Sequence, residues 1–204
     1  IIPSMINNDM RVFAYPFTDY WKDVGTIDAY WHANMELTQT VPEFNLYDEF
    51  WKIYTNLDHQ PPQFIGEEAN LKYSLISEGC EINGEIYNSV IGPNVMVEKG
   101  AVIKDSIIMA DSVIKEGAKV NHSIIAERAV IGKKAHIGHG EIVPHVTKPN
   151  IYSTGISVIG EETVIPNGII IGRNCEVSGI TKESSYQDGK LESGHSLIIE
   201  EGIL

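Results

Sequence analysis

The residue of this sequence best suited to bind a metal ion is an aspartate near its start. Asp23 lies in segment 20–26, two residues before Gly25, and directly precedes a predicted helix. Magnesium prefers a few carboxylates together with phosphate oxygens and water, and a glycine lets a substrate approach the backbone closely. From the residues alone, Asp23 fits a magnesium ligand as well as it fits an aspartate that caps a turn.

Three histidines form a second candidate site. His136, His139 and His145 follow the pattern HxxHxxxxxH. Zinc binding needs imidazoles that converge on one point. Ile137 is predicted to point inward between the first two histidines, which places them on different parts of one turn. We therefore expect surface histidines here rather than a metal centre.

The elements that position these side chains are organised by a repeat. Aliphatic residues recur at steps of six, and four tetrapeptides start with serines 15, 17 and 17 residues apart. The tetrapeptides are 74–77, 89–92, 106–109 and 123–126, and the six-residue steps include Ile91, Val97 and Ile103, and later Ile159, Ile165, Ile171 and Val177. Neither the helical period of 3.6 nor strand alternation explains a period of six. Three such units close one coil, and stacked coils form three parallel sheets with the aliphatic residues toward the axis.

The repeat also predicts the domain boundaries. Residues 71–204 are assigned to the stacked coils, with an interrupting loop near 141–156 that contains two prolines, and with 196–199 as a final strand. Residues 39–70 are too apolar for a flexible linker, and we expect an ordered connector packed between two domains. Residues 1–38 contain no hexapeptides and are assigned to a different domain.

Two elements are predicted within residues 1–38. Residues 12–15 are expected to form a short, mostly buried strand. Thr26 is the expected N-cap of a helix over 27–37, with Asp28 in its first turn. One face of this helix is apolar or small, and it consists of Ile27, Tyr30, Trp31, Asn34 and Met35.

Composition excludes several classes of protein. The 204 residues carry a formal net charge of −13, which disfavours nucleic acid and anionic membranes as partners. Hydrophobic residues make up 43%, enough for a sizeable core, and no stretch approaches the roughly 18 apolar residues of a membrane span. Cys80 and Cys175 are too few for a disulfide scaffold, so we expect buried thiols and a cytoplasmic location.

Segment 20–34, YWKDVGTIDAYWHAN, closely resembles the end of the catalytic domain of the glucose-1-phosphate adenylyltransferases. Segments 46–55 and 61–64 resemble the connector of that family, and 74–79 (SLISEG) the start of its β-helix. The resemblance covers nearly the whole chain, more weakly after residue 140. It implies a mainly β fold: a left-handed parallel β-helix of hexapeptide repeats, preceded by the C-terminal remnant of an α/β nucleotidyltransferase domain.

The resemblance also implies a reaction and the residues that serve it. Family members make ADP-glucose and pyrophosphate from ATP and glucose 1-phosphate with Mg²⁺, for glycogen or starch synthesis. Asp23 corresponds to one of two metal-binding catalytic aspartates, and Trp21 and Gly25 to the wall near the sugar, although Trp21 is equally consistent with a core residue. Family members bind phosphorylated effectors through basic residues of the β-helix. The candidates here are Arg128, Lys133, Lys134 and Lys148.

The chain departs from the family pattern in two places. The Gly-rich GGxGTRLxPLT loop is absent, as are the sugar-phosphate lysine and the second metal-binding aspartate, and the chain opens with Ile1 rather than Met. We therefore expect a C-terminal piece that is inactive alone and serves assembly and regulation in a homo- or heterotetramer. Segment 152–156 lacks the basic residue found there in many relatives, which argues against strong activation by a sugar phosphate.

Three alternatives stay open from the sequence. The first is a non-catalytic regulatory subunit of the same enzyme, in which the helix only holds subunits together. The second is a hexapeptide-repeat acyltransferase, since such enzymes use a catalytic histidine. The third is another sugar-nucleotide pyrophosphorylase with the same architecture, against which the YWKDVGTIDAYWHAN segment argues.

Overall fold

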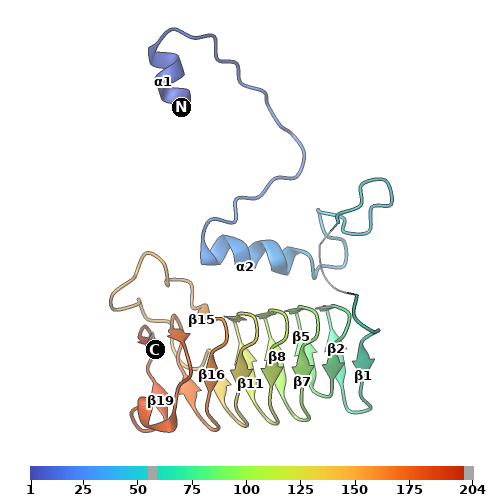
Figure 1. The fold of residues 1–204 in the computed structure, drawn as a ribbon, viewed down its shortest axis with the longest axis vertical. Coiled ribbons are helices and arrows are strands. Elements are labelled where there is room, and N and C mark those ends of the chain that lie inside the picture. Colours follow the sequence, from blue (N-terminus) through green and yellow to red (C-terminus); the bar gives the residue numbers. More distant parts are fainter. Residues whose placement is uncertain (55–58, 200–204) are drawn as a thin grey trace.

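The computed structural model describes residues 1–54 and 59–199. Figure 1 shows a parallel β-solenoid with one helix lying along it and an N-terminal segment that leads away from it. The predicted fold class is confirmed: three sheets run the length of the solenoid, and every strand pair within them is parallel. We call them sheets A, B and C.

Each coil contributes one short strand to each sheet in turn. Sheet A contains β1 (Phe64–Ile65), β4 (Glu81–Ile82), β7 (Met96–Val97), β10 (Val113–Ile114), β13 (Val130–Ile131) and β16 (Val164–Ile165). Sheet B contains β2 (Asn70–Lys72), β5 (Glu85–Tyr87), β8 (Val102–Lys104), β11 (Lys119–Asn121), β14 (His136–Ile137), β17 (Ile170–Ile171) and β19 (Lys190–Leu191). Sheet C contains β3 (Leu75–Ile76), β6 (Val90–Ile91), β9 (Ile107–Ile108), β12 (Ser123–Ile125), β15 (Ser157–Ile159), β18 (Glu176–Ser178) and β20 (Ser196–Ile198).

The core lies on the solenoid axis and consists of the residues that define the period of six. Ile91, Val97 and Ile103, one from each sheet, are all fully buried. Their register partners in the next coil are Ile108, Ile114 and Val120, so each aliphatic side chain stacks on an equivalent one. Cys80 and Cys175 are buried free thiols, as predicted, and burial raises the pKa of both.

A ladder of buried serines seals one corner of the solenoid. Ser106 Oγ accepts a hydrogen bond from the backbone N–H of Ser123 at 3.2 Å and donates one to Lys104 O at 2.6 Å. Ser89 makes the same pair of bonds one coil earlier. Each hydroxyl therefore satisfies a backbone donor that the turn would otherwise leave buried and unpaired. The spacing of the serines in the sequence follows from this role.

The N-terminal residues differ from the expectation. The predicted strand over 12–15 is wrong: the segment is coil, and Phe13 and Tyr15 are 85% and 88% exposed. An apolar run needs a partner strand to be buried, and none within the described residues lies beside it. Helix α1 (Ile2–Asn7) precedes this segment and has no buried residue.

The described part of the connector is exposed on this chain. Val41, Tyr47 and Phe50 face solvent, and the packing of this segment against a second domain stays a prediction. Residues 55–58 of the predicted connector lie outside the described residues. The first strand of the solenoid, β1, begins at Phe64, within the range assigned to the connector.

The remaining elements lie close to their predicted positions. Helix α2 (Ile27–Glu36) begins where the sequence predicts it, and no strand forms between β14 and β15, where the interrupting loop is expected. A 3₁₀ turn, η1 (Glu183–Ser185), precedes β19, and β20 is the predicted final strand. Among the described residues, no helix is both long and apolar enough to cross a membrane.

Replacement of one ladder serine tests its contribution. Ser106→Ala leaves the buried Ser123 N–H without its acceptor, so the free energy of unfolding should fall by about 1–3 kcal/mol. Urea unfolding monitored by circular dichroism measures the change. Ser153→Ala, at an exposed serine of the interrupting loop, is the control and should change stability by less than about 0.5 kcal/mol. Equal effects of the two substitutions would contradict the role of the ladder.

Candidate functional site

The candidate site is the loop that carries Asp23 and ends at the N-terminus of α2. Thr26 is in an extended conformation, and its side chain accepts a hydrogen bond from the backbone N–H of Ala29 at 3.1 Å. Asp28 lies in the first turn, where a carboxylate interacts favourably with the helix dipole. The predicted cap therefore fixes the point at which the loop ends, three residues after Asp23.

Asp23 is exposed, and its carboxylate folds back over the loop. Oδ1 accepts a hydrogen bond from the Gly25 N–H at 2.9 Å. A Cβ added to Gly25 would lie 3.0 Å from the same oxygen, so a larger residue there would crowd the carboxylate. The glycine thus permits the close approach of Asp23 itself. One oxygen of Asp23 shapes the turn, and the carboxylate still faces solvent.

Trp21 is 71% exposed and does not contribute to the core of the described residues. It lines a shallow hollow between the loop, α2 and the connector. The other residues of this hollow include Tyr20, Lys22, Val24, Asn34 and Phe44. The side chain of Asp23 does not line it. The structure therefore places Trp21 and Gly25 on the same exposed loop as Asp23, and leaves their roles near a sugar as predictions.

The loop is held against the far end of α2 by polar contacts. Lys22 Nζ lies 2.7 Å from Glu36 Oε1, and the Tyr20 hydroxyl donates to Glu36 Oε2 at 3.1 Å. The hydrogen bond from Lys22 holds the pKa of Glu36 below its usual value. The Tyr20 ring also stacks on Phe44 of the connector, with ring centroids 5.2 Å apart. These contacts tie Tyr20 and Lys22, just before Asp23, to the helix that follows it.

Helix α2 lies on the outer face of sheet C. Met35 packs with Ile107, Ile124 and Ile156, all of which are buried. The helix residues Ile27, Tyr30 and Trp31 pack against this cluster, as the predicted apolar face requires. Ile107 and Ile124 are register partners that point outward from β9 and β12, so the helix crosses neighbouring coils.

Two hydrogen bonds fix α2 on the solenoid. Trp31 Nε1 donates to the backbone carbonyl of Asp105 at 2.8 Å, and Thr38 Oγ1 bonds to Asn88 Oδ1 at 2.8 Å. Asn88 in turn donates to Asp105 Oδ1 at 2.7 Å, which joins the two anchor points into one network. The sequence indicates the apolar face, but not these bonds, because Asn88 and Asp105 lie more than 50 residues from the helix.

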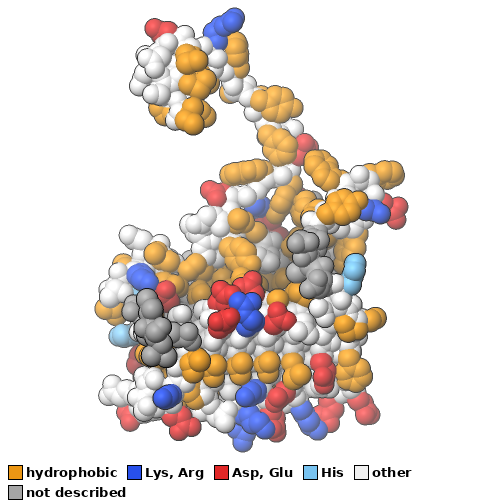
Figure 2. Space-filling model, in the orientation of Figure 1, with side chains coloured by type: hydrophobic (Ala, Val, Ile, Leu, Met, Phe, Trp, Pro, Cys, Tyr) orange, Lys and Arg blue, Asp and Glu red, His pale blue; other side chains and the backbone are white. Residues whose placement is uncertain are grey.

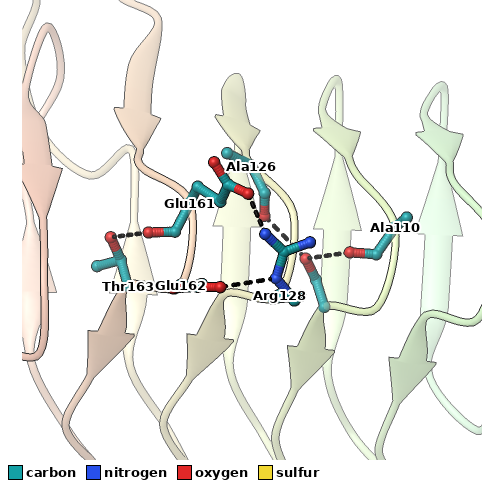
Figure 3. A network of polar contacts seen from close by, with 7 residues as sticks. Ala110, Ala126, Arg128, Glu161, Glu162 and Thr163 are labelled. Atoms are coloured by element: carbon teal, nitrogen blue, oxygen red, sulfur yellow. Dashed lines mark hydrogen bonds and ion pairs between the residues drawn. The ribbon is translucent and has the colours of Figure 1, made fainter.

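The four basic residues proposed for effector binding lie at three different corners. Arg128 is in the turn between β12 and β13, Lys133 and Lys134 are between β13 and β14, and Lys148 is in the interrupting loop. Figure 3 shows Arg128 joined to both Glu161 and Glu162 of the next coil, and its Nε lies 2.9 Å from Glu162 Oε1. The structure therefore does not gather these residues into one site.

Two further members of this set are paired. Lys133 Nζ lies 3.0 Å from Glu116 Oε2, and Lys148 Nζ lies 2.6 Å from Glu176 Oε2. An anionic effector at either lysine would have to compete with a carboxylate of the same chain. Within the described residues, Lys134 makes no ion pair.

The histidines divide into a pair and a single residue. His136 and His139 are adjacent, with ring centroids 4.5 Å apart, so their predicted separation on one turn is wrong. The turn after Ile137, which is buried as predicted, brings His139 back beside β14. Among the described residues, no group of three or more His, Cys, Asp or Glu side chains is placed to hold a metal ion.

His145 is buried, with 2% of its surface exposed, which corrects its prediction as a surface histidine. Its Nδ1 accepts backbone N–H bonds from Thr147 and Lys148 at 3.2 and 3.0 Å, so the ring proton lies on Nε2, 2.9 Å from Ser196 Oγ. Ser196 then donates to Glu176 at 3.0 Å. A serine hydroxyl that accepts a hydrogen bond from a histidine N–H is not activated as a nucleophile. These hydrogen bonds therefore anchor the interrupting loop.

Two family models match this chain. One, described as GlmU-like, C-terminal hexapeptide, matches residues 61–159, and one described as Nucleotidyl transferase matches residues 1–40. The Nucleotidyl transferase match covers the Asp23 loop and α2, and the hexapeptide match covers most of the solenoid.

Curated relatives carry one name. A glucose-1-phosphate adenylyltransferase of Thermosipho melanesiensis is 57% identical over 104 residues, which is 51% of this chain and 25% of the relative. One of Lachnospira eligens is 52% identical over 99 residues (48% and 23%), and one of Acetivibrio thermocellus 43% over 157 residues (77% and 37%). The predicted resemblance to this family is confirmed. The chain spans about a quarter to a little over a third of the length of these relatives.

The anchoring of α2 can be tested by replacing Trp31 and, as a control, Trp21. Trp31→Phe removes the bond to the Asp105 carbonyl, so the docking of α2 should weaken by about 1 kcal/mol and its amide hydrogens should exchange several-fold faster. Trp21→Phe is the matched control, because Trp21 is exposed and is not part of the cluster that packs α2 on sheet C. Hydrogen exchange measured by mass spectrometry reports both. Unchanged protection of α2 in Trp31→Phe would contradict the anchor.

The stability of the fold should depend on pH through one buried and two half-buried histidines. Burial lowers the pKa of His122, His136 and His145, so the folded state binds fewer protons than the unfolded state. The stability that these neutral rings contribute is complete above their ordinary pKa of about 6.5 and is lost as the pH falls below it. His145→Gln should reduce this loss and speed hydrogen exchange in 141–156 at neutral pH. A pH profile of His145→Gln identical to that of the wild type would exclude a role for His145.

Proposed function

We propose that this chain is the C-terminal part of a glucose-1-phosphate adenylyltransferase, which joins glucose 1-phosphate to ATP and releases pyrophosphate. The observation that carries the proposal is the Asp23 loop, whose YWKDVGT sequence is capped onto a helix that is docked on a hexapeptide solenoid. The names of the relatives support the same activity. The substrates, ATP and glucose 1-phosphate, are part of the proposal because the chain covers only a fraction of those proteins.

In the proposed reaction, an oxygen of the glucose 1-phosphate phosphate attacks the α-phosphorus of ATP. A new P–O bond forms, the bond between the α-phosphorus and the bridging oxygen breaks, and pyrophosphate leaves with the electron pair. Negative charge builds on the α-phosphate, and a bound Mg²⁺ would neutralise part of it. Asp23 would contribute one carboxylate ligand to that ion.

The residues of this chain fit magnesium only in part. Asp23 offers an exposed carboxylate whose Oδ1 is already oriented by Gly25, and magnesium takes one or two carboxylates with substrate phosphates and water. A second carboxylate would come from the part of the family fold that this chain does not contain. The chain alone is therefore expected to be inactive.

We propose that the main role of the solenoid is the assembly of subunits, and that regulation by an effector is its secondary role. The outward sheet faces and the coil ends need covering, so the parent enzyme is expected to be a homo- or heterotetramer. Three of the four basic effector candidates are already paired with carboxylates, so a phosphorylated effector would bind there only by displacing Glu116, Glu161, Glu162 or Glu176. A cytoplasmic location is consistent with two unpaired, buried cysteines.

The main alternative is a non-catalytic regulatory subunit of the same enzyme. Retention of Asp23 and of the capped DVGT loop favours a catalytic parent, because a subunit that only holds its partners together needs the docked helix but not the carboxylate. The acyltransferase alternative would use a histidine beside an acyl-CoA site. His136 and His139 are adjacent, and His136 lies in β14 of sheet B, whereas α2, which follows the Asp23 loop, packs on sheet C.

Replacement of Asp23 tests the proposal in the intact protein that contains this chain. Asp23→Asn keeps the turn, because the amide oxygen still accepts the Gly25 N–H, but removes the charge. Release of pyrophosphate from ATP and glucose 1-phosphate with Mg²⁺ should fall by about 100-fold or more. The matched control Asp28→Asn, five residues later and also exposed, should lose less than threefold.

Three results would count against this assignment. Unchanged turnover of Asp23→Asn would remove the metal role of Asp23. A well-folded wild-type protein without activity would favour the regulatory subunit, and acyl transfer from acyl-CoA by this chain alone would favour the acyltransferase.

A further inference from the structure

Helix α2 follows the corner at which the chain passes from sheet B to sheet C. Three consecutive coils hold Asn88, Asp105 and His122 at this corner, with positive φ values of 45°, 49° and 47°. Thr38, just after the helix, bonds to Asn88. Earlier in the helix, Trp31 bonds to the Asp105 carbonyl, and its ring centroid lies 4.7 Å from that of His122. Toward its start, the helix therefore reaches later coils of the solenoid.

The interrupting loop occupies the next corner of this series. It begins after β14 of sheet B and ends at β15 of sheet C, where the earlier coils have only one or two residues. Strands of adjacent coils lie about 4.8 Å apart and a helix rises about 1.5 Å per residue, so one coil corresponds to about three residues of α2. This spacing places the loop beside the first turn of α2, one turn before Trp31. In agreement with this, Ile156 at the end of the loop belongs to the buried cluster against which Ile27 packs.

One buried side chain closes the base of this loop. Asn174, which is fully buried in the turn between β17 and β18, donates from Nδ2 to the Val143 carbonyl at 2.6 Å. Its Oδ1 accepts a hydrogen bond from the Gly155 N–H, also at 2.6 Å. Both ends of the loop are thus held by one residue, and the buried His145 anchors the segment between them. The loop is therefore a compact Ω-loop whose two ends lie together.

His122 joins the closed loop to the helix. Its Nε2 lies 3.2 Å from the carbonyl oxygen of Thr154, which can only accept a hydrogen bond, so Nε2 carries the proton. The same ring meets the Trp31 ring at an interplanar angle of 63°. The side chains of the equivalent residues in the two earlier coils, Asn88 and Asp105, bond to each other instead, at 2.7 Å. The corner itself therefore does not need a histidine, and the His122 ring serves the contact between loop and helix.

We propose that the interrupting loop is a buttress for the start of α2, and that His122 is a positioning residue for the Asp23 carboxylate. The contacts lead from Thr154 through His122 to Trp31, in the helix that begins at the Thr26 cap. That cap fixes the end of the Asp23 loop. The proposal rests on the metal role proposed above for Asp23, because a metal ligand must be held within about 0.5 Å of its productive position.

The other contacts of the Asp23 loop are more exposed. Figures 1 and 2 show that the chain before α2 leads away from the solenoid, so the loop is connected to the solenoid through the helix. At the far end of the helix, Lys22 pairs with Glu36, but their side chains are 42% and 28% exposed. Such an exposed pair holds a loop only weakly. The position of Asp23 therefore depends mainly on how firmly the start of α2 is held.

Hydrogen exchange of the intact protein measures the buttress. His122→Asn removes the ring but suits the corner, because asparagine tolerates a positive φ and Asn88 occupies the same corner of an earlier coil. The amide hydrogens of residues 29–33 in α2 should exchange several-fold faster in this variant. His136→Asn is the matched control, since His136 is also half-buried but lies in β14 of sheet B, and it should leave this exchange unchanged. Unchanged exchange in His122→Asn, or equal acceleration by both variants, would overturn the proposal.

The Mg²⁺ dependence of pyrophosphate release tests whether the buttress positions Asp23. The Mg²⁺ concentration that gives half the maximal rate should rise several-fold in His122→Asn, because residues that orient a metal ligand set the affinity for the metal. It should stay unchanged in His136→Asn. A loss of stability alone would lower the amount of active protein, and would not change this concentration.

Opening the loop at its base provides a second variant. Asn174→Gly removes both hydrogen bonds that close the loop, and glycine adopts the φ of 54° at this position without strain. It should produce the same rise as His122→Asn, and the double variant should show no further rise, because both substitutions act through one link. Additive effects of the two substitutions would exclude transmission through His122.

These outcomes separate the proposal from the enzyme assignment. Full turnover of Asp23→Asn would remove the metal role and with it the positioning role, whereas faster exchange in His122→Asn would still establish the buttress. If Asp23→Asn abolishes turnover while His122→Asn keeps the Mg²⁺ dependence of the wild type, the positioning role is overturned and the reaction stands.

Discussion

The stacking of each inward aliphatic side chain on its equivalent in the next coil is the interaction on which the rest of the structure depends. Ile108, Ile114 and Val120 are buried only because neighbouring coils lie above and below them. Each strand therefore contributes one aliphatic side chain to a narrow core, and each added coil increases the stability of the solenoid. A consequence is that every outward residue stands in a column, and the composition of a column decides what the face binds.

Sheet C shows this consequence within one chain. Its column is apolar, and α2 lies across it with Trp31 and Thr38 bonded to the turns beside it. The Asp23 loop is attached to this helix at one end by the Thr26 cap and at the other by the contact of Lys22 with Glu36. The stacked coils thus hold the helix, and the helix holds the loop that carries the carboxylate. A site attached to regular elements is positioned more precisely than a site on an unsupported loop.

The sequence specifies the repeating parts of this structure far better than the others. The period of six, the ladder serines and the Thr26 cap each express a local rule with a physical cause, and all three are found in the structure. Where the partner is distant, prediction fails. Residues 12–15 are apolar enough for a strand but have no partner strand among the described residues, and the burial of His145 depends on Ser196, 51 residues later.

The candidate site divides in the same way. Asp23, Gly25 and the helix after them are adjacent in sequence, so their arrangement follows from one turn and one cap. The four basic residues are spread over three corners, and nothing in a local pattern says which corner each will occupy or which carboxylate it will meet. Lys133 and Glu116 are equivalent turn residues of adjacent coils, so the repeat that aligns them in space also pairs them.

The ion pairs between coils bear on regulation. Because successive turns stack, a basic residue at one turn lies beside a carboxylate of a neighbouring turn. Lys133 pairs in this way with Glu116, and Arg128 pairs with Glu161 and Glu162. An anion that bound these residues would release carboxylates that then repel it, so exposed basic residues in a solenoid of net charge −13 are weaker anion sites than their number suggests. Lys134 and Lys115 differ because they make no ion pair within residues 1–54 and 59–199. Both lie at corners between sheets A and B, where no carboxylate of a neighbouring coil within the described residues pairs with them.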